Sequence, residues 1–119
     1  MLYEIKDVQQ EENGPFCRWF ADRDFDLFVW YNPDNSFFGF QLCYQKSKDE
    51  KALTWKSTTG FAHERVDLGS KERANVTPLL VTDSVFPKEK VARMFLERSQ
   101  EIDSIISDFV YNKILESRI

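Results

Sequence analysis

The chain has 119 residues, of which 42% are hydrophobic and 15% aromatic, so it has enough apolar side chains for one compact core and is not of a disordered composition. Its 16 basic and 20 acidic residues give a net charge of -4 and are interspersed along the chain. A nucleic-acid partner is therefore not expected, because a phosphate-binding surface needs clustered Lys and Arg side chains.

No apolar run approaches the ~18 residues that a membrane span needs. The first ten residues, MLYEIKDVQQ, lack the apolar segment of a signal peptide. These features predict a cytoplasmic protein with no membrane partner. The two cysteines, Cys17 and Cys43, are too few for a disulfide framework and lack metal-ligand spacing, so we expect two free thiols.

Two short strands are expected at the start of the chain. Residues 2–8 place Tyr3 and Ile5 on one face of a first strand, and residues 16–20 (FCRWF) form either a short second strand or an extended entry to the strands that follow. Between them, Asn13-Gly14-Pro15 is a turn signal. The way in which these two strands pair stays open.

Residues 24–55 alternate apolar and polar side chains, with turns at 32–35 and 46–49, and predict three antiparallel strands. With four-residue loops, Val29 faces Phe38 in the first hairpin. In the second hairpin, Leu42 faces Leu53. Together the two registers place one apolar set on a single face: Phe25, Leu27, Val29, Phe38, Phe40, Leu42, Leu53 and Trp55.

The opposite face of this meander is unusual for a face in contact with water. It is expected to carry three aromatic residues and a polar row, namely Phe28, Trp30, Phe37, Asp26, Gln41 and Thr54. In the expected register, Trp30 lies beside Phe37. Either other parts of the chain cover this face, or it is a binding or dimer surface.

A fourth strand of the meander is expected at 61–66 (FAHERV), after a four-residue loop at 57–60. This loop length places His63 opposite Thr54, where it extends the polar row. His63 is the only histidine, and a carboxylate such as Asp26 could orient its imidazole. A lone histidine without metal-ligand spacing is also compatible with a purely structural role.

The last third of the chain changes pattern. A polar loop is expected at 67–75, followed at 76–82 by a short strand or extended segment. Pro78 restricts this strand to a sheet edge, or itself to the first residues of the strand. From Pro87 the period becomes helical, and Asp83 or Ser84 could cap the helix. Its apolar stripe should cover the core face of the sheet: Val91, Phe95, Ile102, Ile106, Phe109 and Ile114.

One continuous helix over 87–119 would be about 50 Å long, whereas a seven-residue strand spans about 23 Å. The whole segment therefore cannot pack on one sheet. Because the apolar stripe weakens at 98–101, we favour a break that gives two helices. The alternative is an overhanging helix whose second half pairs with another subunit.

The segments RWFADRDFDLFVW, FGFQLCY, ALTW and HERVD resemble those of a family of small uncharacterised bacterial proteins. The resemblance extends over residues 18–109. It implies a bacterial, cytosolic, stand-alone domain and supplies no catalytic residues.

The sequence therefore predicts an α+β fold: an antiparallel β-meander of about five or six strands with one face covered by a C-terminal helix or pair of helices. We expect a single domain over 1–119, mainly β over 1–82 and helical over 87–119. No catalytic, cofactor or metal-binding motif is recognisable. Asp22, Asp24 and Asp26 alternate but lack the remainder of a calcium-loop pattern.

Two functional hypotheses follow. The first is a non-enzymatic binding or interaction module that uses the aromatic and polar face, either as a homodimer or with an unknown small ligand or protein. The alternative is a small enzyme or small-ligand-binding protein with a pocket around Asp26, Gln41, Thr54 and His63, in which Trp30 forms an apolar wall.

Overall fold

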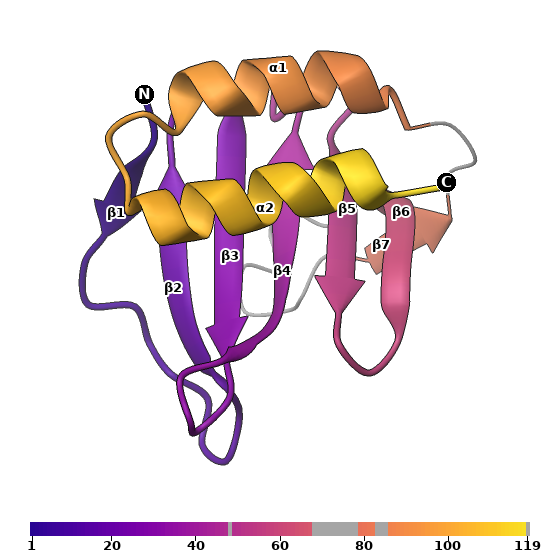
Figure 1. Ribbon diagram of the computed structural model, residues 1–119. Coiled ribbons are helices and arrows are strands. Elements are labelled where there is room, and N and C mark those ends of the chain that lie inside the picture. The colour runs from indigo at the N-terminus through magenta and orange to yellow at the C-terminus, as the bar shows by residue number, and fades with distance from the viewer. Residues whose placement is uncertain (48, 68–78, 83–85, 119) are drawn as a thin grey trace.

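The computed structural model describes residues 1–47, 49–67, 79–82 and 86–118. It has two layers, a seven-stranded antiparallel sheet and two helices that lie across one of its faces (Figure 1). The strands are ordered as in the chain, so the predicted α+β meander is confirmed. The elements are β1 (Tyr3–Ile5), β2 (Phe16–Ala21), β3 (Phe25–Tyr31), β4 (Phe37–Tyr44), β5 (Lys51–Lys56), β6 (Gly60–Asp67), β7 (Leu79–Thr82), α1 (Lys88–Arg98) and α2 (Ser104–Glu116).

The first two strands pair with each other, with Ile5 opposite Trp19, and β2 then pairs with β3. Beyond the end of β1, the side chain of Gln10 continues the pairing along β2. It accepts a hydrogen bond from the Cys17 amide at 2.8 Å and donates one to the Cys17 carbonyl at 2.9 Å. The Gln10 amide thus satisfies backbone groups that would otherwise need a neighbouring strand.

The β3–β4 hairpin differs from the predicted register, because Val29 lies opposite Phe40 and not opposite Phe38. Part of the difference comes from the loop. It is one residue shorter than expected, since the Asn32 amide donates a hydrogen bond to the Ser36 carbonyl at 2.8 Å. The rest comes from a β-bulge in which Phe38 is an additional residue of β4.

The bulge turns Phe37 away from the face on which it was predicted. Its ring stacks on Phe109 of α2, with ring centroids 4.0 Å apart and an interplanar angle of 8°. Phe37 therefore belongs to the helix-covered face, and Gly39 takes its place opposite Trp30. The predicted pair of Trp30 and Phe37 is wrong.

The β4–β5 hairpin has the predicted register, with Leu42 opposite Leu53 and Phe40 opposite Trp55. The predicted core residues other than Phe38 do form the core. Trp55 packs against a buried set that lies between sheet and helices: Phe25, Leu27, Val29, Phe40, Leu42 and Leu53, with Phe95, Ile106, Val110 and Ile114 from the helices.

The β5–β6 hairpin overturns the prediction for the histidine. Gly60, at a φ of 78°, lies opposite Lys56, so three residues form the loop instead of four. Removing one residue from a hairpin loop exchanges the two faces of the following strand. His63 therefore lies opposite Leu53, not Thr54, and is 2% exposed on the helix-covered side.

The two helices run antiparallel across the sheet, as Figure 1 shows, and the predicted break near 98–101 is confirmed. At 1.5 Å per residue they are about 16 and 20 Å long, so each can lie over the sheet. Asp103 caps α2 by accepting a hydrogen bond from the Ile105 amide at 2.9 Å. No helix in the described part of the chain has both the length and the apolar character to cross a membrane.

Several predictions fall on residues outside those described. These are most of the polar loop expected at 67–75, the first part of the strand expected at 76–82, and the helix caps Asp83 and Ser84. Within the described residues, Pro87 takes the N-cap position of α1.

An ion-pair network joins the N-terminus, the β2–β3 turn and the end of α1. Arg98 lies 3.3 Å from Asp22 and 2.6 Å from Asp24, and the Leu2 amide donates a hydrogen bond to the Arg98 carbonyl at 2.8 Å. Burial acts to raise the pKa of the Asp22 carboxyl, but hydrogen bonds from the turn amides and Arg98 outweigh it, so this pKa is lowered. These two acids thus have a structural role.

We predict that Gly39→Ala lowers the free energy of unfolding by about 1–3 kcal/mol, measured by urea denaturation. A Cβ at Gly39 would collide with the carbonyl oxygen of Trp55 and lie 3.1 Å from the Cα of Lys56. Both are backbone atoms, so no side-chain rotation relieves the contact. Gly14→Ala is the matched control, because its Cβ would meet mainly the flexible side chain of Glu11. Equal losses in the two variants would contradict this account.

Candidate functional site

The sheet face opposite the two helices is here called the open face, because both helices of the described residues lie on the other face (Figure 1). Three aromatic side chains on it are half-buried: Trp19, Phe28 and Trp30. Trp19 stacks on Phe28 with ring centroids 5.6 Å apart, and the Lys56 Nζ lies 5.6 Å from the centroid of Trp30. The face is therefore aromatic as predicted, but with Trp19 and without Phe37.

The predicted polar row forms only in part. Gln41 Nε2 donates a hydrogen bond to Thr54 Oγ1 at 3.0 Å, across β4 and β5. The changed β3–β4 register moves Asp26 out of line with this pair. Its carboxylate instead accepts a hydrogen bond from Trp19 Nε1 at 3.0 Å and lies 3.3 Å from Lys46 Nζ. Asp26 is thus bonded to Trp19, a member of the aromatic cluster, and to Lys46.

His63 lies within the core, on the other side of the sheet. Its Nε2 is hydrogen-bonded to the Tyr44 hydroxyl at 2.6 Å, and the ring of Phe86 packs against it with centroids 5.0 Å apart. The sheet separates His63 from Asp26. The residues of the alternative hypothesis therefore do not line one pocket, because the shortened β5–β6 loop reverses the face of His63.

A shallow depression of about 240 Å³ lies on the open face beside Trp30. Three predicted residues, Trp30, Gln41 and Thr54, contribute to its lining. Lys56 and Glu64 add one charge of each sign. A hollow that combines an aromatic wall with an amide, a hydroxyl and charged groups is suited to binding a side chain or small group.

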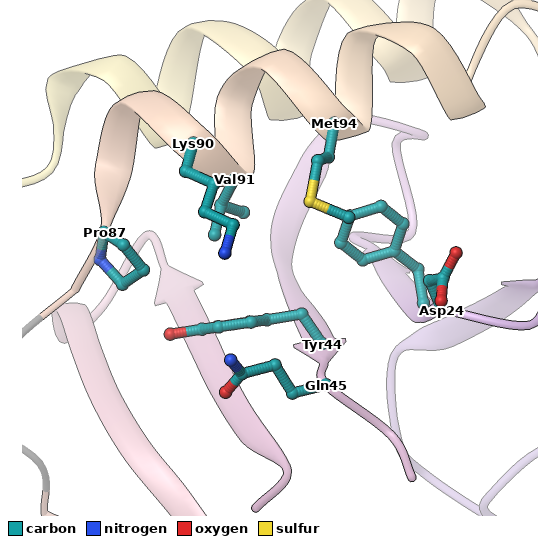
Figure 2. A pocket seen from close by; sticks show the side chains of 8 residues that line it. Asp24, Tyr44, Gln45, Pro87, Lys90, Val91 and Met94 are labelled. Atoms are coloured by element: carbon teal, nitrogen blue, oxygen red, sulfur yellow. The ribbon is translucent and has the colours of Figure 1, made fainter. Parts of the chain in front are cut away.

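A second cavity, of about 150 Å³, lies where α1 crosses the ends of β3 and β4 (Figure 2). Its lining residues come from two distant stretches of the chain: Asp24, Phe25, Tyr44 and Gln45 from the sheet, and Pro87, Lys90, Val91 and Met94 from α1 and the residue before it. Sequence reasoning missed this cavity. No local motif marks it, since it exists only where the helix approaches the sheet.

The described residues contain no group of three or more His, Cys, Asp or Glu side chains that could hold a metal ion. Cys17 and Cys43 are free thiols. Burial, with a smaller contribution from the charges of Glu50 and Asp26, raises the pKa of the Cys43 thiol to about 12. Cys43 is therefore protonated at neutral pH and is a poor nucleophile.

Comparisons of the chain with protein-family models, curated proteins and solved structures found no match.

We predict that Cys43 in the folded protein reacts with a disulfide reagent at pH 8 at least about 100-fold more slowly than in the unfolded protein. The reason is that a thiol with a raised pKa has very little thiolate at this pH, and the rate should rise as the pH approaches 12. The measurement uses Cys17→Ser, in which Cys43 is the remaining thiol. Fast reaction of folded Cys17→Ser at pH 7 would instead indicate an activated cysteine.

Proposed function

We propose that the protein is a non-enzymatic binding module whose open face binds a second copy of the same chain. The observation that carries this proposal is the cluster of Trp19, Phe28 and Trp30, which is only partly buried on the face opposite the two described helices. Tryptophan and other aromatic residues are enriched at protein interfaces because they bury a large apolar area with few rotatable bonds.

The charges on this face favour a second copy as the partner. Lys56 and Glu64 line the same depression and have opposite charges. In a dimer with two-fold symmetry, each patch meets the same patch of the partner, so a surface with both signs can provide its own complement. A nucleic acid or a strongly charged protein would require a surface of one sign.

The size of the face also suits a homodimer. Seven strands spaced about 4.8 Å apart extend over about 29 Å, and the longest strands, β4 and β6, are about 26 Å long. This area is comparable with the roughly 800 Å² per partner that a standard stable interface buries. The depression beside Trp30 adds a place where a side chain of the partner can be inserted.

Among the described residues, the acid and base groups that the alternative hypothesis requires are not collected on the open face. Asp26 is bonded to Trp19 and Lys46, and His63 lies on the opposite side of the sheet. Gln41 and Thr54 are bonded to each other. These contacts favour binding over acid–base catalysis at this face.

We predict that the wild-type protein is a dimer by sedimentation equilibrium at ~100 µM and that Trp30→Ser raises its dissociation constant at least about tenfold. The substitution removes an aromatic ring from the proposed interface. Thermal unfolding of each variant shows that the monomer fold is retained.

Ile105→Ser is the matched control for this experiment. Ile105 is 68% exposed on α2, so it is also a large apolar surface residue but lies on the helix side of the molecule. Its substitution should leave the dissociation constant unchanged. A wild-type protein that stays monomeric, or an equal weakening by Ile105→Ser, would overturn the proposal.

A further inference from the structure

We infer that the cavity beneath α1 is a binding site for a small apolar molecule with one anionic group, such as an aromatic carboxylate. This site is on the helix side of the sheet and is independent of the open face (Figure 2). The size of the cavity, the chemistry of its walls and the balance of charge at its rim all favour such a ligand.

The size of the cavity suits a single six-membered ring. Its volume of about 150 Å³ is similar to that of engineered apolar protein cavities that admit benzene. Phe25, Val91 and Met94 supply apolar walls, and the ring of Tyr44 lies across the side opposite the helix, as Figure 2 shows. Pro87 limits the cavity at the start of α1.

The rim of the cavity has one charge that is unpaired and one that is paired. The side chain of Lys90 extends from α1 toward the ring of Tyr44 (Figure 2), and among the described residues no carboxylate pairs with it. Asp24, the acidic residue of the lining, lies 2.6 Å from Arg98 and is neutralised by it. The uncompensated charge is therefore positive, which favours a ligand with a carboxylate.

The position of Tyr44 gives the site a rigid base. Its hydroxyl is hydrogen-bonded to buried His63, and its ring packs edge-on against Phe86 with centroids 6.0 Å apart. A ring whose both ends are fixed loses little conformational freedom when a ligand packs on it. The long side chain of Lys90 can adjust its position to the anion.

The test is a titration of the ¹⁵N-labelled full chain with benzoate, followed by amide chemical shifts. We expect saturable shifts at Tyr44, Gln45, Lys90 and Val91, with a dissociation constant in about the millimolar range for so small a ligand. Lys90→Ala should weaken benzoate binding about tenfold, because it removes the charge-assisted contact.

Arg93→Ala is the control for charge. Arg93 is exposed on the same helix and is absent from the cavity lining, so its removal changes the net charge equally without touching the site. It should weaken binding by less than about twofold. Equal weakening by the two substitutions would show that benzoate responds only to the overall charge, and would overturn the inference.

A neutral ligand and a cavity-filling substitution test the apolar part. Benzyl alcohol should shift the same amides in the wild type and in Lys90→Ala, and Met94→Trp should abolish binding of both ligands while the remaining spectrum is retained. Benzoate binding should persist in Trp30→Ser, which separates this site from the open face. Absence of saturable shifts around the cavity in the wild type would overturn the inference.

Discussion

The contact of α2 with the sheet through Phe109 is the interaction on which the arrangement of the molecule depends. The Phe109 ring stacks on Phe37 and meets the edges of Phe40 and Trp55, with centroids 6.1 and 5.6 Å away. Two short helices can cover only one face of a single sheet. This contact therefore places both described helices on one face of the sheet, and Trp19, Phe28 and Trp30 lie on the other.

The β-bulge at Phe38 affects the side chains on both faces of the sheet. It directs Phe37 toward α2 and places Gly39 beside Trp30. Because Gly39 has no side chain, Lys56 can pass over it and approach the ring of Trp30. One local irregularity thus completes the helix-covered core and also shapes the depression on the opposite side.

Strand positions and the helical break could be predicted from alternation, turn residues and simple lengths. The face of the sheet on which each side chain lies was harder to predict, because it depends on single residues in loops and bulges. One residue fewer before β6 placed His63 in the core, and the shorter β3–β4 loop together with the bulge at Phe38 moved Asp26 away from Gln41. The cavity beneath α1 was beyond prediction, since Lys90 and Tyr44 meet only through tertiary packing.

The central claim, that the open face binds a second copy, can be tested most directly by ¹⁹F NMR of protein labelled with fluorotryptophan. The chain has 3 tryptophans, of which Trp19 and Trp30 lie on the open face and Trp55 on the covered face. Dilution should shift the signals of Trp19 and Trp30 and leave that of Trp55 in place. Signals of Trp19 and Trp30 that do not change with concentration would contradict the account.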